Sequence, residues 1–335
     1  MITIAQVGVG IWGQNHTRVF SNINGCHLKV CCDKKKESLD KASAISHKSL
    51  LVTDNFDDII QDKAIDGVVI TTPAATHAEL ALRTLESGKH VFVEKPLALN
   101  LGDAKKMIES AHRNKKILMV GHLLLYHPAV KMLKSYIKDG SLGDIYYIYS
   151  TRVNLGQVRH EENVLWSLIS HDISVALHLI EKKPVSVRAI GRSYIRKNIE
   201  DVAFVTIDFE NNVVVHIHAS WLDPHKMRKF TIVGSKKMAV FDDMESNEKI
   251  RIYDKGFDWE KKGTTYDTFL TLREGDVLIP RIEMAEPLKV ECRHFIDCIK
   301  DNKQPITNGE NGLEVLTILD AAQKSLEKNG EAVKV

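Results

Sequence analysis

Short apolar stretches alternate with helix-like segments through the first 122 residues, and this alternation limits the fold more than any other feature of the chain. Strands that alternate with helices need crossover connections, so they predict a parallel sheet with helices on both faces. We therefore predict an α/β protein that opens with a doubly wound parallel sheet. The predicted strands in this part are residues 2–7, 28–32, 67–70, 91–93 and 117–120.

A glycine-rich turn directly follows the first strand and leads into a predicted helix at residues 14–21. In the spacing GxGxxG, the first glycine permits a tight bend, and the second lets a pyrophosphate approach the backbone. The third lets the helix lie close to the sheet. The amino end of that helix offers free N–H groups and a positive dipole end to phosphates. The turn therefore predicts a dinucleotide site, with contacts at Gly8, Gly10, Ile11, Trp12 and Gly13.

An acidic residue ends the second strand. Asp33 lies 20 residues after Gly13, where a carboxylate accepts hydrogen bonds from the adenosine ribose hydroxyls. Its negative charge opposes the 2′-phosphate of NADP, so we predict NAD as the cofactor. The lysines at 34–36 follow and offset part of that charge.

Two charged residues, Glu94 and Lys95, follow the apolar strand 91–93, and Pro96 ends it because proline cannot donate to a central ladder. Ligands of open parallel sheets bind at this carboxyl edge. Taken alone, the two residues are typical of an ion pair that closes a surface loop. At a nicotinamide site, the Lys95 ammonium would instead stabilise the alkoxide that develops when a secondary alcohol is oxidised.

The second half of the chain is dominated by strands, with a hairpin turn expected at Asn211-Asn212. We predict an N-terminal domain of residues 1–122 and a C-terminal α/β domain of residues 123–335 with a largely antiparallel open sheet. Because one face of that sheet must be covered or solvated, we also expect a homodimer or homotetramer. The predicted strands are residues 145–154, 185–191, 202–209, 213–221, 230–234, 239–242 and 249–253, and residues 165–181 form a helix between them.

Composition excludes several other classes of protein. The net charge of the 335 residues is +2 with both signs interspersed, so we expect neither a nucleic-acid nor a membrane partner. The first residues are typical of a strand and not of a signal peptide. The five cysteines show no paired zinc-ligand spacing, so we expect reduced thiols, no metal and a cytoplasmic protein.

The ordered motifs resemble the glucose–fructose oxidoreductase / inositol dehydrogenase / rhizopine catabolism family. The resemblance implies a Rossmann domain, a second domain whose open sheet often mediates oligomers, and NAD(P)-dependent oxidation of a sugar or cyclitol hydroxyl. It adds Thr72, Pro73, His77, Glu94, Lys95 and His122 to the expected cofactor contacts, although His122 is equally consistent with a cap on its strand. The motifs are 8–13, Asp33, Thr72-Pro73 with His77, 88–91 running into Glu94-Lys95-Pro96, and Gly121-His122 with Tyr126 and Pro128.

A second catalytic residue is implied by the same resemblance. In the family pattern, a histidine on the helix at 165–181 joins the lysine at the reacting hydroxyl, and His171 matches it. Imidazole titrates near neutrality, which suits a proton carrier. The family commonly has an aspartate four residues earlier, where this chain has Ser167, and Asp172 points elsewhere on a helix. The simpler alternative is a helix histidine that hydrogen bonds within the core.

The second half resembles the nucleotide-sugar 3-dehydrogenases of the family, which implies that the C3 hydroxyl of UDP-N-acetylglucosamine is oxidised for a partner aminotransferase. A diphosphate needs cations, and the planar fork of arginine suits phosphate oxygens. The alternatives are a free sugar, a cyclitol, a UDP-sugar uronate, or a ligand sensor that has lost catalysis. The expected substrate contacts are Lys95, Arg152, Asn154, Arg159, Asn163, Trp166, His171, Lys226 and Arg228.

Overall fold

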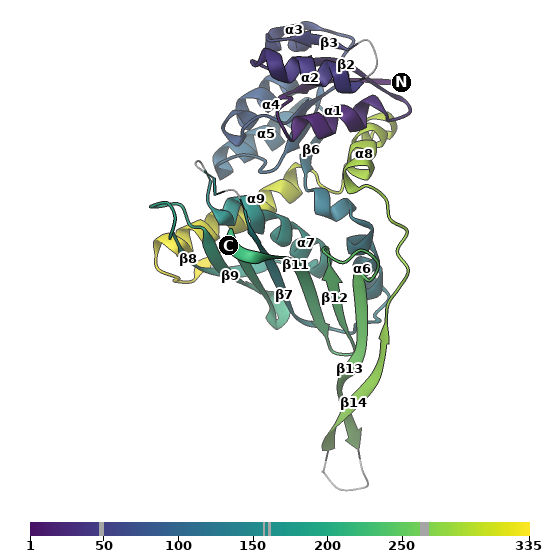
Figure 1. The fold of residues 1–335 in the computed structure, drawn as a ribbon, viewed down its shortest axis with the longest axis vertical. Coiled ribbons are helices and arrows are strands. Elements are labelled where there is room, and N and C mark those ends of the chain that lie inside the picture. Colours follow the sequence, from purple (N-terminus) through teal and green to yellow (C-terminus); the bar gives the residue numbers. More distant parts are fainter. Residues whose placement is uncertain (47–49, 157, 160–161, 262–267) are drawn as a thin grey trace. The chain divides into compact units, whose positions relative to one another are not determined.

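The computed structural model describes residues 1–46, 50–156, 158–159, 162–261 and 268–335. They form two compact units (Figure 1). Unit 1 contains Met1–Tyr126 and Ala285–Thr317, and unit 2 contains His127–Met284 and Ile318–Val335. This division differs from the predicted domains, 1–122 and 123–335, because a late segment of the chain returns to unit 1. None of the helices in these ranges is long and apolar enough to cross a membrane.

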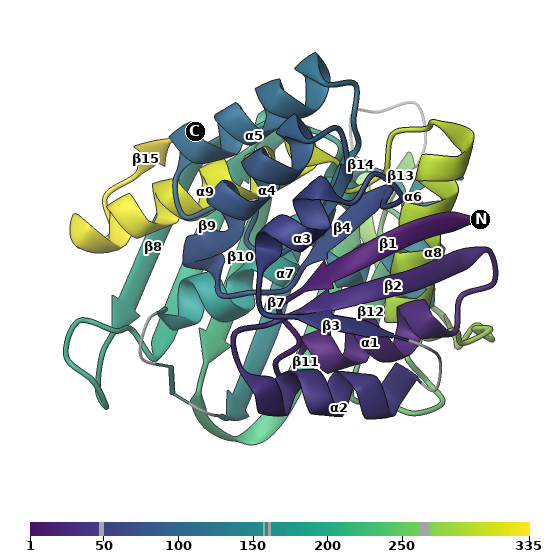
Figure 2. The ribbon, with the colours of Figure 1, turned by 90° about the horizontal axis from the view of Figure 1, so that it is seen from above.

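Unit 1 contains the predicted doubly wound parallel sheet, with the order β3-β2-β1-β4-β5-β6 among its described strands. Helices α1 and α2 lie on one face, and α4 and α5 lie on the other (Figure 2). Both faces are covered, which explains why β4 and the centre of β5 are entirely apolar. The elements are β1 Ile2–Val7, α1 Gly13–Ser21, β2 Cys26–Cys32, α2 Lys36–Ser46, β3 Leu51–Thr53, α3 Phe56–Gln61, β4 Gly67–Ile70, α4 His77–Glu86, β5 His90–Glu94, α5 Leu101–Arg113, β6 Leu118–Gly121 and α8 Pro287–Asp301.

The returning helix α8 completes the core of unit 1. Its Phe295 is fully buried and meets Phe92 of β5 edge to face, with 5.7 Å between ring centroids. Phe92 also meets Phe20 of α1, at 6.5 Å. Aromatic pairs of this geometry stabilise a core beyond the area that they bury. The first turns of α9 (Gly309–Glu327) also belong to unit 1, and its later turns belong to unit 2.

Unit 2 is built on one large sheet, whose described strands have the order β14-β13-β12-β11-β7-β10-β9-β8-β15. All neighbours are antiparallel except β7 and β10, so the predicted largely antiparallel sheet is confirmed. Strands β13 and β14 form a long hairpin that continues beyond β12 (Figure 1). The elements are α6 Pro128–Lys138, β7 Ile145–Leu155, α7 Ser170–Ile180, β8 Pro184–Arg192, β9 Val202–Phe209, β10 Val213–Ser220, β11 Leu222–Gly234, β12 Met238–Asp242, β13 Ile250–Lys261, β14 Thr268–Leu278 and β15 Val333–Lys334.

Local details of unit 2 both follow and depart from the sequence prediction. Asn211 and Asn212 both have φ of 60° and connect β9 to antiparallel β10, as the predicted hairpin turn requires. Strand β11 begins at Leu222 and not at residue 230, because a register shift between Leu222 and Met227 accommodates Pro224 within the strand. The predicted helix 165–181 is two elements, a π-helical turn at Leu165–Ile169 and then α7.

Candidate functional site

The glycine turn has the shape that a dinucleotide site requires. Gly8 has φ of +85°, and a Cβ there would lie 2.8 Å from the backbone of Thr71 and Thr72. A Cβ on Gly13 would collide with the Gly8 carbonyl and would lie 2.9 Å from the Thr71 hydroxyl. A Cβ on Gly10 would meet no protein atom within 4 Å. Two of the glycines are therefore needed for close packing, and the third leaves the backbone open to a ligand.

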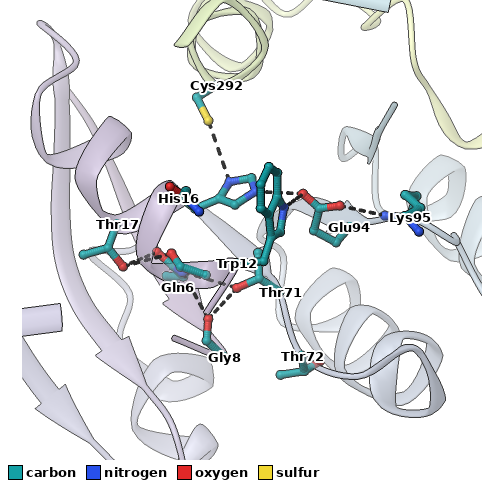
Figure 3. Close-up of polar contacts among 12 residues, drawn as sticks. Gln6, Gly8, Trp12, His16, Thr17, Thr71, Thr72, Glu94, Lys95 and Cys292 are labelled. Carbon is teal, nitrogen blue, oxygen red and sulfur yellow. Dashed lines mark hydrogen bonds and ion pairs between the residues drawn. The ribbon is translucent and has the colours of Figure 1, made fainter. Parts of the chain in front are cut away.

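A buried amide that the sequence analysis did not identify holds the turn in place. The Gln6 Nε2 donates to the carbonyl oxygens of Gly8 at 3.1 Å and Gly13 at 2.7 Å, and its Oε1 accepts from Thr17 at 3.0 Å (Figure 3). The side chain is 0 % exposed. Losing it would remove one donor from each of these two carbonyl oxygens, which the Thr71 and Thr17 hydroxyls also contact, at a cost of about 1–3 kcal/mol. The signal in the sequence was a single amide inside the apolar strand 2–7.

The start of the turn is fixed by Asp33, which directly follows β2. Asp33 Oδ2 accepts from the Val9 N–H at 2.8 Å, and Oδ1 accepts from the Lys35 N–H at 2.9 Å. Each carboxylate oxygen has a second lone pair, so Asp33 is held beside the turn with acceptor capacity for ribose hydroxyls. Ile11 is 93 % exposed and Trp12 is 44 % exposed, so both flank the turn at the surface.

The predicted cofactor contact His77 has a different position from the one expected. It is 1 % exposed, and its ring nitrogens lie 2.8 Å from the Pro96 carbonyl oxygen and 2.9 Å from that of Thr72. Burial lowers the pKa of His77 below its ordinary value, because it disfavours the charged form of the ring. Both ring nitrogens are engaged by these carbonyl oxygens, so His77 fixes the loops after β4 and β5. Thr72 and Pro73 remain partly or fully exposed at that edge.

His122, at the end of β6, is buried without a partner. It is 2 % exposed, and neither ring nitrogen has a hydrogen-bond partner among the described residues. Burial lowers the pKa of His122 to about 4, so the ring is neutral near pH 7. A neutral imidazole offers one donor and one acceptor, and a nicotinamide carboxamide offers the complementary pair. The orphaned ring therefore fits the predicted cofactor contact better than a strand cap, which would occupy a ring nitrogen.

Glu94 and Lys95 lie at the carboxyl edge, where the sequence placed them. The Glu94 carboxylate accepts from the Trp12 indole N–H at 2.7 Å, pairs with His16 Nε2 at 2.8 Å and accepts from the Lys95 N–H at 3.1 Å (Figure 3). Burial opposes ionisation of Glu94, but the contacts from His16 and Trp12 outweigh it and keep its pKa below the usual value. Glu94 is thus an anion held by three protein groups.

A second carboxyl group near Glu94 has the opposite character. Glu291 of α8 is 0 % exposed, and neither carboxyl oxygen has a hydrogen-bond partner in the described part of the chain. Burial, with the charge of Glu94 adding to it, raises the pKa of Glu291 well above the usual value. Glu291 therefore remains a neutral carboxylic acid in the folded protein. Nothing in the sequence separated it from the exposed acids of the helices.

We predict that Glu291→Gln stabilises the protein more at high pH than at low pH. The folded pKa is raised, so above the ordinary value of 4.5 the unfolded chain loses a proton that the folded chain keeps. The unfolding free energy then falls by about 1.4 kcal/mol per pH unit until the folded pKa is reached. Glutamine removes this penalty. Unfolding of both proteins at pH 5, 7 and 8 measures the difference, and a pH-independent difference would contradict the prediction.

In unit 2, the candidate proton carrier His171 lies in the first turn of α7 and is half-buried, directly after the π-helical turn that contains Ser167. Such π-bulges are frequent at functional sites. Asp172 turns to the sheet, where it accepts from Ser150 at 2.6 Å and from Arg152 Nε at 2.6 Å. Asp172 is therefore engaged by β7. Lys95 belongs to unit 1 and His171 to unit 2, so their meeting at one hydroxyl stays a prediction.

Three predicted substrate contacts are already engaged within unit 2. Arg152 forms a buried ion pair with Asp172, so its charge is neutralised by the protein. Asn163, 9 % exposed, donates to Glu200 at 2.6 Å and to Gln323 at 3.1 Å. Trp166 donates its indole N–H to the same Gln323 oxygen at 3.2 Å. Asn163 and Trp166 thus join the π-helical turn to α9, a structural role that the sequence analysis did not assign to them.

The other predicted substrate contacts lie nearer the surface. Arg159 is exposed and pairs with Glu162 at 2.9 Å, and Arg228 pairs with Asp243 at 3.4 Å. Lys226 is exposed on β11, and Asn154 is half-buried near the end of β7. The predicted phosphate cations therefore include two surface arginines whose present partners are carboxylates.

Comparison with known families assigns both halves of the chain. Residues 2–122 match the model of the GFO/IDH/MocA oxidoreductase family, described as an NAD-binding Rossmann fold. Residues 130–240 match the model of the C-terminal domain of the same family. The chain belongs to the GFO/IDH/MocA family. It therefore has an NAD-binding Rossmann domain, and the family resemblance inferred from the motifs is confirmed.

Individual relatives are distant. The NAD⁺-dependent scyllo-inositol 2-dehydrogenase of Bacillus subtilis (strain 168) is 25 % identical over 100 % of this chain and 96 % of its own length. Among solved structures, UDP-N-acetylglucosamine 3-dehydrogenase GnnA of Acidithiobacillus ferrooxidans has a TM-score of 0.82 at 22 % identity, covering 98 % of both chains. A levoglucosan dehydrogenase in complex with NADH and levoglucosan has a TM-score of 0.85 at 22 % identity, covering 100 % of this chain and 99 % of its own. At this identity, the structural likeness concerns the fold.

Proposed function

We propose that this oxidoreductase uses NAD to oxidise a ring secondary hydroxyl of a sugar or cyclitol. The proposal depends mainly on the position of Lys95. It directly follows β5, and β5 is separated only by β4 from β1, the strand that leads into the glycine turn of the NAD-binding fold. The substrates named for the relatives support it, since inositol, a UDP-sugar and levoglucosan all have ring hydroxyls. Asp33 beside the turn supports NAD over NADP.

In this proposal, bound NAD supplies the hydride acceptor, and the residues of the chain handle the proton and the charge. Lys95 donates to the hydroxyl oxygen and stabilises the alkoxide as it forms. His171 accepts the proton as general base, the commonest role of an imidazole in such chemistry. Asp172, the carboxylate that follows it on α7, is paired with Arg152.

We expect Lys95→Ala and His171→Ala each to lower kcat by about 10²–10⁴-fold, because that is the usual contribution of a general acid or base. Binding of NADH, measured by fluorescence titration, should change little in either variant. Lys106→Ala, on the exposed face of α5, is the matched control for Lys95 and should retain wild-type kcat. Near-normal kcat in one catalytic variant would remove that residue from the mechanism, and no turnover with any ring alcohol would favour a ligand sensor.

We further propose UDP-N-acetylglucosamine as the substrate, oxidised at C3. The likeness of residues 152–172 and 220–228 to nucleotide-sugar 3-dehydrogenases supports this choice. The 3-keto product is then suited to an aminotransferase, because transamination requires a carbonyl group. An inositol-like cyclitol is the second candidate, since a full-length sequence relative is a scyllo-inositol dehydrogenase.

The ion pairs of unit 2 separate these two candidates. A diphosphate has to displace carboxylates from the arginines, Glu162 from Arg159 and Asp243 from Arg228. These exposed pairs are worth only about 0–1 kcal/mol, whereas a charge-assisted contact to phosphate contributes about 1.5–3 kcal/mol. The exchange therefore favours phosphate. A neutral cyclitol carries no charge to attract the arginines and would leave both ion pairs intact.

We predict that Arg159→Ala raises the KM for UDP-N-acetylglucosamine about ten- to a hundredfold and leaves that of any free sugar nearly unchanged. Glu162→Gln is the matched variant, because it frees Arg159 without removing it and should lower the same KM. The measurement is NADH formation with UDP-N-acetylglucosamine, N-acetylglucosamine, scyllo-inositol and myo-inositol. Turnover of an inositol or free sugar but not of the UDP-sugar would contradict the UDP-N-acetylglucosamine proposal. It would still agree with oxidation of a ring hydroxyl of a sugar or cyclitol.

We also propose that a second copy of the chain covers the open face of the unit 2 sheet. That face exposes Tyr147 and Tyr149 of β7, Phe204 of β9 and Ile190 of β8, each at least 41 % exposed. Exposed apolar surface of this kind is typical of an interaction site. We expect a dimer or tetramer by light scattering at micromolar protein, and Tyr149→Lys with Phe204→Lys should shift it towards monomer. A monomeric mass for the unmodified protein would refute the proposal.

A further inference from the structure

Glu94 receives its hydrogen bonds from three different parts of unit 1. The Trp12 indole, in the glycine turn, donates to Oε1 at 2.7 Å, and His16 of α1 meets the same oxygen at 2.8 Å. The other oxygen, Oε2, accepts from the backbone N–H of Lys95 at 3.1 Å. One carboxylate thus connects the dinucleotide turn to the residue that we propose acts on the substrate (Figure 3).

The surroundings hold this carboxylate firmly. Gly121 of β6 lies beneath it, where an added Cβ would be 3.0 Å from the carboxyl group, so a larger residue there would push against the Glu94 side chain. On its far side, His16 Nδ1 lies 3.7 Å from Cys292 Sγ of α8, which supports the ring from behind. The Glu94 side chain is only 12 % exposed. A carboxylate with so many fixed contacts is poorly placed to bind a cofactor directly. It is well placed to keep Trp12, His16 and the Lys95 backbone in fixed positions relative to one another.

Trp12 links Glu94 to the glycine turn, where a dinucleotide would bind. It lies next to Gly13, the third glycine of the turn, and is 44 % exposed, so a bound dinucleotide will change its surroundings. Its indole N–H is committed to Glu94. At the other end, the positive charge of Lys95 is among the causes that keep Glu94 ionised. The charges of Glu94 and Lys95 therefore attract each other at this end of the connection.

We propose that Glu94 is a positioning residue that transmits dinucleotide occupancy of the glycine turn, through Trp12, to the position and protonation of Lys95. This replaces the direct cofactor contact that the sequence predicted for Glu94, and it rests on the proposed function in assigning a task to Lys95. The titratable groups that face Glu94 are His16, His77, Lys95, His122, Glu291 and Cys292.

The test follows Lys95 itself and needs no substrate. The full chain is treated with a small amine-acylating reagent at a series of pH values, and the acylated fraction of Lys95 is measured by peptide mass spectrometry. Glu94→Gln should shift the midpoint of labelling to lower pH by about one unit, which makes Lys95 about tenfold more reactive below both midpoints. Glu109→Gln, an exposed acid on α5, should leave the midpoint unchanged. Equal midpoints for Glu94→Gln and the wild type would overturn the proposal.

Transmission from the turn is tested with ADP-ribose, which supplies the pyrophosphate but has no nicotinamide to cover Lys95. ADP-ribose should change the labelling rate of Lys95 in the wild type and not that of Lys106. The change should disappear in Trp12→Phe, which keeps an aromatic ring but loses the indole donor, while ADP-ribose still binds by calorimetry. The same change in Trp12→Phe and the wild type, or none in the wild type, would overturn the proposal.

A failure of this proposal can be told apart from misfolding of a variant and from failure of the proposed function. If Glu94→Gln does not fold, Trp12→Phe still tests the connection, because it removes one donor from a half-exposed side chain. The proposed function fails separately, through near-normal kcat in Lys95→Ala, and labelling of Lys95 does not depend on that result. A merely structural Glu94 would lower stability in Glu94→Gln without shifting the midpoint of Lys95.

Discussion

The backbone register of four parallel strands determines the rest of the site. Val7 of β1 lies beside Ile70 of β4, Ile70 beside Val93 of β5, and Val93 beside Val120 of β6. The next residues along these strands are then aligned as well, and they are Gly8, Thr71, Glu94 and Gly121. A slip of one residue in any strand would turn its side chains to the other face. The glycine turn, the glutamate and the small residue beneath it are adjacent because of these ladders alone.

The sequence predicted this edge because each of its parts has a local signature. A glycine spacing, an acid after a strand and a charged pair before proline can all be recognised within a few residues. The contacts that hold the edge are not local, since His16 and Glu94 are 78 residues apart and Cys292 is 276 from His16. The burial of Glu291 near Glu94, far from it in the chain, belongs to the same class. Sequence patterns report periodicity, whereas pairing between distant side chains is decided only by packing.

Unit 2 was less predictable for a related reason. The sequence analysis proposed its arginines as candidate cations, but it could not show which of them a distant carboxylate already pairs, as Asp172 of α7 pairs Arg152 of β7. A buried pair of this kind is difficult to disrupt, because removing one partner leaves an uncompensated charge. Arg152 is therefore a poor candidate for phosphate, whereas Arg159 and Arg228 exchange partners more readily. The distinction depends on burial, which composition and spacing do not reveal.

The return of residues 285–317 to unit 1 has a consequence for how the protein is made. A ribosome releases the strands of the parallel sheet long before it releases α8, whose Phe295 packs against Phe92 and whose side chains also approach Gly67 of β4. Until then, part of the apolar surface of the nascent sheet has no cover. Unit 1 therefore reaches its final form only after nearly all of unit 2 has been synthesised. For the same reason, a chimera that joins this chain to a relative at a single point between the two units would divide a core. Residues 285–317 would then come from a different protein than the rest of unit 1.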